Sequence, residues 1–289
     1  MDSFTFYYYT PSAAAAGIFV GLFGVSTLLH FYQLVRTRTW FMIPFAIGGV
    51  METIGYVGRL LSSIESPDFT KGPYIMQSAL ILIAPAFLAA SIYMVLGRII
   101  AMLDAEKCSF IPLRFLTKVF VTGDVLSFLM QASGAGIMVK DDDSAQMGEN
   151  IIVGGLFVQI AFFTVFVITA AIFEIRMARR RVVVSNELRH IWRRQMTALC
   201  FTSILILIRS IVRVVEYILG YDSWLMRQEV FIYVFDAMFM FIVLLTLNWI
   251  HPSQVNCALG RGEKYFDKLV KARKFVPKAR TEMESMVHV

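Results

Sequence analysis

The chain contains seven apolar stretches, each about as long as the roughly 20 residues that a helix needs to cross a bilayer. Because lipid offers no hydrogen-bond partner to backbone N–H and C=O groups, such stretches favour continuous helices. Charged residues make up only 17% of the chain, and the number and length of the stretches exclude a soluble helical protein. The pattern predicts an all-α membrane protein, a bundle of seven transmembrane helices at residues 12–35, 40–62, 76–100, 117–138, 151–174, 196–219 and 229–250.

Lysine and arginine are distributed unequally between the two ends of this bundle. Of the 27 in the chain, 20 fall in the connections 36–39, 104–118 and 175–195 or after residue 251, whereas the opposite connections hold three. Cytoplasmic segments carry an excess of this kind. We therefore expect residues 1–11 to be extracellular or lumenal, residues 12–250 to form the transmembrane domain, and residues 251–289 to be a basic cytosolic tail. The net charge of +6 then faces anionic lipid, so nucleic acid is not expected as a partner.

Motifs that carry enzyme chemistry are missing from the sequence. No GxxxxGK[ST] or GxGxxG phosphate-binding motif follows a strand pattern, and no nucleophile and base are arranged for catalysis. The four histidines are scattered, which does not suit a zinc site. We therefore expect no enzyme activity, no cofactor and no metal. "SGAG" at 133–136 is interpreted as a site of close helix packing through small residues.

Three charged side chains interrupt the apolar segment LILIRSIVRVVEYILG at Arg209, Arg213 and Glu216. Their spacing of i, i+4 and i+7 places them within about 60° of one another on one face of a helix. The same spacing recurs in the spans 40–62 and 229–250, and polar residues also line the three spans between 76 and 174. The candidate residues of this polar interior are Glu52, Tyr56, Arg59, Gln77, Arg98, Asp124, Gln131, Gln159, Arg209, Arg213, Glu216, Glu229, Tyr233 and Asp236.

Charges inside a bilayer need partners, because each isolated one costs about 3 kcal/mol on insertion scales. Four acidic and four basic residues lie within the predicted spans, so they can balance one another. From their depths we expect one cluster that contains Glu52, Arg59, Arg209, Arg213, Glu216 and Asp236. Arg98 either pairs with Asp124 or extends to the membrane surface. Buried pairs of this kind can fix helix register or line a substrate path, and both interpretations stay open.

Several segments carry a resemblance to a known family: ETIGYVGR, QSALILIAPAFLAASIYMVLGR, DVLSFLMQASGAG, GGLFVQ, RSIVRVVEY, EVFIYVFD and the HP at 251–252. In these segments, across about residues 40–252, the chain resembles the fungal RTA-like, lipid-translocating exporter family. The resemblance implies a seven-helix protein of the plasma membrane or an endomembrane. It also implies movement of sphingoid long-chain bases and resistance to toxic amphiphiles, with porphyrin transport in one branch. The motif match assigns the family's positions to the candidate residues above, together with Pro85 and Tyr93.

The leading hypothesis is a translocator or exporter of lipids or other amphiphiles, without an ATPase of its own. Its expected partners are membrane lipids or amphiphilic small molecules, and no protein partner is predicted. The first alternative is a seven-helix receptor or sensor, although the sequence lacks a DRY motif in the third span and an NPxxY motif in the seventh. The second is a regulator of lipid asymmetry and the stress response.

Overall fold

The computed structural model describes residues 11–65, 70–140, 145–179, 186–219 and 229–260. All regular structure in these residues is helical, as predicted. Most of the predicted N-terminal segment and residues 261–289 of the basic tail lie outside the described residues. The elements are α1 (Ala13–Thr37), η1 (Trp40–Met42), α2 (Ile43–Ile64), α3 (Lys71–Met102), η2 (Glu106–Cys108), α4 (Leu113–Lys140), α5 (Ala145–Arg179), α6 (Asn186–Leu219), α7 (Glu229–Phe231), the π-helix η4 (Ile232–Met238), α8 (Phe239–Trp249) and α9 (Ser253–Ala258).

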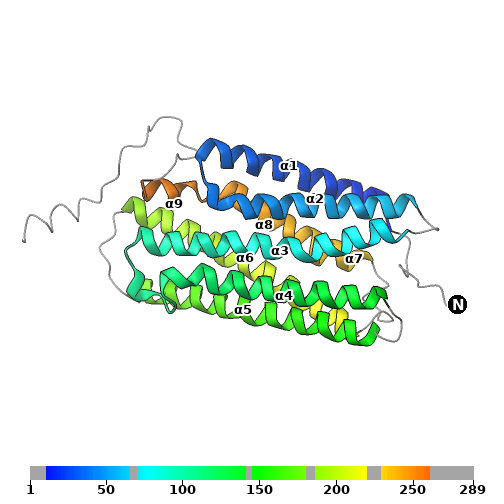
Figure 1. Cartoon of the computed structure of the whole chain (residues 1–289). Helices are drawn as coiled ribbons and strands as arrows, with labels where there is room; N and C mark the ends of the chain where they lie inside the picture. Colours follow the sequence, from blue (N-terminus) through cyan, green and yellow to red (C-terminus); the bar gives the residue numbers. More distant parts are fainter. Residues whose placement is uncertain (1–10, 66–69, 141–144, 180–185, 220–228, 261–289) are drawn as a thin grey trace, which may run out of the picture.

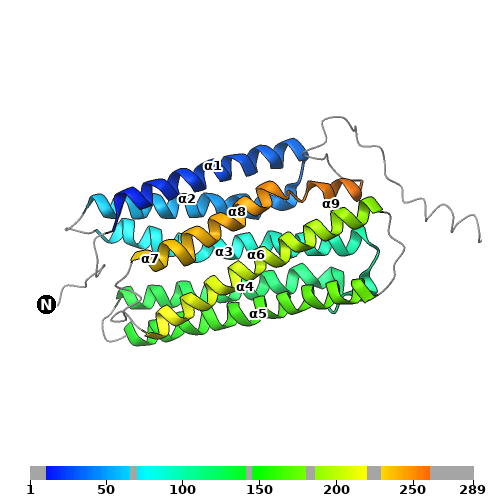
Figure 2. The ribbon, with the colours of Figure 1, turned by 180° about the vertical axis from the view of Figure 1, so that it is seen from behind.

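The long helices run side by side along one axis of an elongated bundle (Figure 1). Helices α1 and α2 form one edge, α4 and α5 form the other, and α3 lies between them. From behind, α6 and the α7–η4–α8 segment cross the opposite side of α3 (Figure 2). We refer to the two ends of the bundle as the α9 end and the α7 end, after the short helices found there.

Among the described residues, six helical segments are long and apolar enough to cross a membrane, and they correspond to six of the seven predicted spans. They are residues 13–37, 40–64, 72–102, 146–179, 188–219 and 229–258. The remaining predicted span corresponds to α4, a helix of 28 residues that includes Arg114, Lys118 and Asp124. That α4 also crosses the membrane stays a prediction.

Local sequence signals set the ends of the first two spans. Ser12 caps α1, since its side chain accepts a hydrogen bond from the backbone N–H of Ala15. Arg38 ends α1 in a left-handed conformation with φ 55°, and its backbone N–H donates to the carbonyl of Leu34. A proline in the first turn of α2 starts that helix without losing an intrahelical hydrogen bond. The two spans therefore meet in a short connection at the α9 end.

Glycines bring α4 and α5 into close contact. A Cβ atom at Gly134 would lie 2.5 Å from the backbone carbonyl oxygen of Gly148, a distance that real Cβ atoms do not adopt. A Cβ atom at Gly136 would meet none of the described residues within 4 Å. The prediction of close helix packing at "SGAG" is therefore confirmed at Gly134 but wrong at Gly136.

This difference predicts opposite effects for two equivalent substitutions. Gly134→Ala is expected to lower the free energy of unfolding by about 1–3 kcal/mol, because the backbones of α4 and α5 must separate. Gly136→Ala is expected to be neutral or slightly stabilising, since alanine favours a helix over glycine by about 1 kcal/mol. Thermal unfolding of both variants in detergent measures the difference. Equal midpoints for the two variants would contradict the close approach at Gly134.

Candidate functional site

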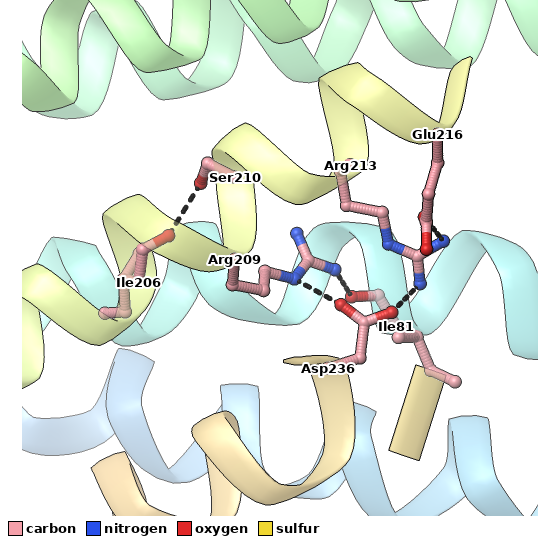
Figure 3. Close-up of polar contacts among 7 residues, drawn as sticks. All are labelled: Ile81, Ile206, Arg209, Ser210, Arg213, Glu216 and Asp236. Atoms are coloured by element: carbon pink, nitrogen blue, oxygen red, sulfur yellow. Dashed lines mark hydrogen bonds and ion pairs between the residues drawn. The ribbon is translucent and has the colours of Figure 1, made fainter. Parts of the chain in front are cut away.

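The predicted polar face of α6 lies inside the bundle and meets the π-helix η4 (Figure 3). Arg209 Nε donates to Asp236 Oδ1 over 2.8 Å, and Arg213 Nη2 pairs with Asp236 Oδ2. Arg213 Nη1 also donates to Glu216 Oε2 over 3.2 Å. We call these four residues the inner cluster. All except Arg213 are at least 95% buried, so two arginines and two acids neutralise one another away from solvent.

Asp236 reaches both arginines from a π-helical turn. Residues 232–238 form this π-helix, which continues directly into α8. π-Turns are rare and occur mostly as local features at functional sites, where they reposition side chains. No pattern in the sequence indicated it, because the i, i+4, i+7 spacing of Glu229, Tyr233 and Asp236 was interpreted as a regular α-helix.

A backbone carbonyl of α3 completes the coordination of Arg209. Its Nη2 donates to the carbonyl oxygen of Ile81 over 2.7 Å (Figure 3). In a regular helix that carbonyl would accept from the N–H of residue 85, but Pro85 has no N–H. The proline therefore frees the acceptor that Arg209 occupies, which satisfies a backbone group that lipid cannot. Pro85 and Arg209 thus act together although 124 residues separate them in the sequence.

Glu52 lies beside the inner cluster without bonding to it. Its side chain is fully buried, and neither carboxyl oxygen has a hydrogen-bond partner among the described residues. Arg209, Arg213 and Asp236 are close enough to act on it electrostatically. The prediction that Glu52 belongs to this group of charges is therefore confirmed only in part: Glu52 lies near the inner cluster, but no hydrogen bond joins them in the described residues.

Arg59 belongs to a separate pair nearer the α7 end, so the prediction of one six-residue cluster is wrong in this respect. Its Nη2 donates to Glu229 Oε1 over 2.9 Å, and its Nε donates to the Tyr233 hydroxyl over 3.0 Å. Glu229 Oε1 also accepts from the backbone N–H of Ser12, 2.8 Å away. We call Arg59 and Glu229 the outer pair. The reason for the separation is depth, since seven residues of helix put Arg59 about 10 Å from Glu52 along the axis.

Aromatic rings pack next to the two groups of charges. The rings of Phe23 and Tyr56 stack at 5.3 Å, and those of Phe19 and Tyr233 stack at 5.5 Å. Tyr56 and Tyr233 face each other at 6.3 Å, and the guanidinium of Arg59 lies 5.0 Å from the Tyr233 ring centre. The Tyr56 hydroxyl is buried without a hydrogen-bond partner among the described residues. Both predicted tyrosines therefore line the polar interior and present ring faces to it.

The other predicted polar residues lie in separate places. Gln131 of α4 donates from Nε2 to Gln159 Oε1 of α5 over 3.2 Å, so this contact holds the two helices together. Asp124 is 5% exposed and lies beside the hydroxyl of Tyr93. Gln77 of α3 is 6% exposed. In the described part of the chain, these residues form no hydrogen bond or ion pair with the inner cluster.

Arg98 lies at the α9 end. Its guanidinium is 3.9 Å from the ring centre of Phe41, and its Nη1 donates to Asn256 Oδ1 over 3.2 Å. The described residues Arg98 and Asp124 do not form an ion pair, so the pairing alternative is wrong. Arg98 instead lines an open pocket of about 310 Å³ together with Thr117 and apolar residues of α3 and α4.

A row of buried polar side chains on α1 is absent from the candidate residues predicted from the sequence. Asn248 Nδ2 donates to Ser26 Oγ over 2.7 Å, and Gln33 Nε2 donates to the carbonyl of Asn248 over 3.0 Å. The ring Nε2 of His30 hydrogen-bonds the carbonyl of Leu244 over 3.0 Å. Ser26, His30 and Gln33 have the same i, i+4, i+7 spacing as the face of α6, and this signal could have found them.

Metal-ligating side chains do not converge in the described part of the chain. No group of three or more histidines, cysteines, aspartates or glutamates there could hold a metal ion. The buried histidines use their ring nitrogens on the backbone instead, as His30 does with Leu244 and His251 Nδ1 does with the N–H of Ser253. In the described residues, the site therefore contains paired charges, the unpaired acid Glu52 and the faces of aromatic rings. Apolar helices enclose these groups.

Comparisons with known proteins agree with this architecture. The chain is 39% identical to Protoporphyrin uptake protein 1 of Saccharomyces cerevisiae over 282 residues, which cover 86% of the chain and 92% of that protein. It is 37% identical to Protein RTA1 of the same yeast over 269 residues, 84% of each chain. It is 24% identical to the Sphingoid long-chain base transporter RSB1 of Saccharomyces cerevisiae over 267 residues, 80% of the chain and 69% of the relative. No solved structure matches the chain.

The family described as "RTA1 like protein" matches residues 45–257, which include most of α2, all of α3 to α8 and every charged residue of the inner cluster and the outer pair. The apolar helices and this match agree on a multi-pass integral membrane protein. The chain therefore belongs to the RTA1-like family of fungal membrane proteins.

Proposed function

We propose that this protein translocates or exports amphiphilic lipids with a charged head group, such as sphingoid long-chain bases, and that it confers resistance to toxic amphiphiles. The observation that carries the proposal is the inner cluster, with Glu52 beside it, buried among apolar helices. Ionisable groups inside a membrane domain typically mark a substrate path. The charged head enters this polar interior, while the apolar tail stays in lipid between the helices. The protein needs no cofactor, no metal and no catalytic residues for this function.

The names of two relatives support an amphiphilic substrate. One relative is an uptake protein for protoporphyrin, and another is a transporter of sphingoid long-chain bases. Both substrates combine a large apolar body with ionisable groups. Acidic groups of the site attract a cationic head, while its arginines keep the acids ionised or receive a phosphate or carboxylate. A single polar interior with both signs of charge thus suits more than one member of this chemical class.

The proposed topology has seven spans, with α4 as the fourth and the α9 end in the cytosol. Described basic residues support this orientation, because Arg36 and Arg38 lie where α1 ends, Arg114 where α4 begins, and Arg176 and Arg179 where α5 ends. These three helix ends lie at the α9 end of the bundle (Figure 1). An excess of lysine and arginine is typical of cytoplasmic loops. We place the protein in the plasma membrane, with an endomembrane as the alternative.

Glu216 offers a test that separates transport from structural support. Glu216→Gln leaves Arg213 paired with Asp236, so the variant is expected to fold and to reach the membrane at normal abundance. Movement of a fluorescent long-chain base across liposomes that contain the purified protein is expected to fall at least about tenfold, equivalent to about 1.4 kcal/mol. Glu106→Gln, which changes an exposed acid of η2, is the matched control and should transport like the wild type.

The other outcomes have definite meanings. If Glu216→Gln loses abundance and transport in equal measure, the ion pairs only fix helix register. If the wild type moves no lipid faster than empty liposomes do, direct transport of long-chain bases is contradicted. A receptor or a regulator of lipid asymmetry then becomes the better description, and ligand-dependent recruitment of a cytosolic partner would identify the receptor.

A further inference from the structure

We propose that the carboxyl group of Glu52 binds a proton and a monocationic head group in alternation, so that the protein exchanges one proton for each cationic amphiphile. This inference rests on the proposed function and adds its energy source, since the direction of transport then follows the proton gradient. The site is a single buried carboxyl next to the inner cluster. Its ligands are a proton and a lipid ammonium group.

Glu52 differs from the acids of the inner cluster and the outer pair because it accepts no hydrogen bond from any described residue. Its side chain has 0% exposure, and both carboxyl oxygens are without a hydrogen-bond partner among the described residues. Glu216, Glu229 and Asp236 each accept from at least one arginine. An ionised carboxylate without such bonds pays the full cost of leaving water. The carboxyl therefore needs either a proton of its own or a cation from outside the cluster.

The charge count of the described site leads to the same conclusion. Arg209 and Arg213 are matched by Asp236 and Glu216 in the inner cluster. Arg59 and Glu229 match each other in the outer pair. Glu52 is the surplus acid, so its ionised form gives the site one uncompensated negative charge. A monovalent cation removes that charge as completely as a proton does.

The groups that face Glu52 come from several elements. Helix α6 contributes Arg209 and Arg213, which are already engaged by other acids, and η4 contributes Asp236, a like charge. Tyr56, one turn along α2, is close enough for Glu52 to act on it electrostatically. Helix α3 approaches α2 through Gly55, where the apolar Ile81 packs. The surroundings thus supply no free cation among these residues, while repulsion from Asp236 opposes an ionised Glu52 without a ligand.

The nearby aromatic faces suit an ammonium group. Tyr56 stacks on Phe23 and faces Tyr233, which stacks on Phe19. Cations bind to the faces of such rings within about 6 Å. Phe19 and Phe23 carry no ionisable group, so their rings attract the head group without adding another acid to the site. Tyr56 thus places an aromatic ring one helical turn from Glu52, where an ammonium bound to Glu52 would meet it.

The exchange step is balanced in charge and atoms. A protonated Glu52 and an incoming ammonium lipid give an ionised Glu52 paired with the ammonium, and one proton leaves the carboxyl oxygen. When the lipid is released on the other side of the membrane, a proton binds to the same oxygen. No bond other than the O–H bond breaks, and the net charge of the site stays constant through the cycle.

Proton release on ligand binding tests this exchange directly. The probe is dodecyltrimethylammonium, a quaternary ammonium amphiphile whose own charge does not change with pH. Wild-type protein in a weakly buffered solution of a neutral detergent is expected to release about one proton per bound cation. Its affinity is expected to weaken by up to about tenfold for each unit of falling pH, because proton and cation compete for one group. Glu52→Gln should abolish both effects, whereas Glu106→Gln should preserve them.

Two further measurements make each result decisive. Glu52→Asp keeps the carboxyl group, so it should still release a proton even if its affinity changes, and thermal unfolding shows whether each variant is folded. Transport of the fluorescent long-chain base in liposomes is measured in parallel. Transport by the wild type with cation binding that releases no proton overturns the exchange and leaves the proposed function intact. Absence of both cation binding and transport overturns the proposed function itself. Proton release that persists in a folded Glu52→Gln assigns the proton to another residue and contradicts the inference.

Discussion

Replacing Asp236 by asparagine is expected to lower the free energy of unfolding by about 3–5 kcal/mol, the usual cost of removing one partner from a buried ion pair. Asp236 accepts from both Arg209 and Arg213, so a neutral amide would leave two buried arginines with only Glu216 as an ionised partner. We expect a large fall in the midpoint of thermal unfolding in detergent and a low yield of folded protein.

Two controls define the result for Asp236. Asp236→Glu keeps the charge and should retain most of the stability, while the exposed Glu106→Gln should change nothing measurable. An unchanged midpoint for Asp236→Asn would mean that water, rather than Asp236, compensates the arginines.

Reversing the charges of the outer pair is the second substitution with a large expected effect. Arg59→Glu places two acids together, and Glu229→Arg places two bases together, so each single variant should lose about 2–4 kcal/mol of stability. The double variant restores opposite charges and should recover at least half of that loss. A double-mutant cycle on unfolding midpoints in detergent measures the coupling.

The hydrogen bonds around the outer pair limit how complete the recovery can be. Arg59 also donates to Tyr233, and Glu229 also accepts from the N–H of Ser12. An arginine at 229 cannot accept from Ser12, so some loss should persist in the double variant. Additive losses with no recovery would show that Arg59 and Glu229 do not act as a pair.

The sequence predicts the helices and the polar faces well because both depend on local patterns. Apolar length fixes where the chain can cross lipid, and the i, i+4, i+7 spacing of Arg209, Arg213 and Glu216 places them on one inward face. Which acid meets which arginine depends on the relative depth and rotation of separate helices. The spacing rule therefore identifies Asp236 and Glu229 as candidate residues, but it does not predict that they pair with different arginines.

Two features escaped prediction because they arise only in three dimensions. The π-helix at 232–238 follows from how this segment packs, and no residue type marks it. Pro85 leaves the carbonyl of Ile81 free, and α6 brings a nitrogen of Arg209 within 2.7 Å of that carbonyl oxygen. The sequence shows the proline, but it does not show which distant donor binds the carbonyl that the proline leaves free.

If the protein translocates lipids as proposed, the contacts between α1 and the last span restrict where a lipid would enter it. The first and last membrane helices are bonded at three levels: Ser12 to Glu229 near one end, His30 to the carbonyl of Leu244 in the middle, and Gln33 to the carbonyl of Asn248 toward the other end. This seam is closed by polar bonds that hydrocarbon cannot replace, so a lipid tail sliding in from the bilayer would have to break them. The first and last helices of the bundle are thus joined to each other, and a lipid would have to enter from the bilayer between other helices.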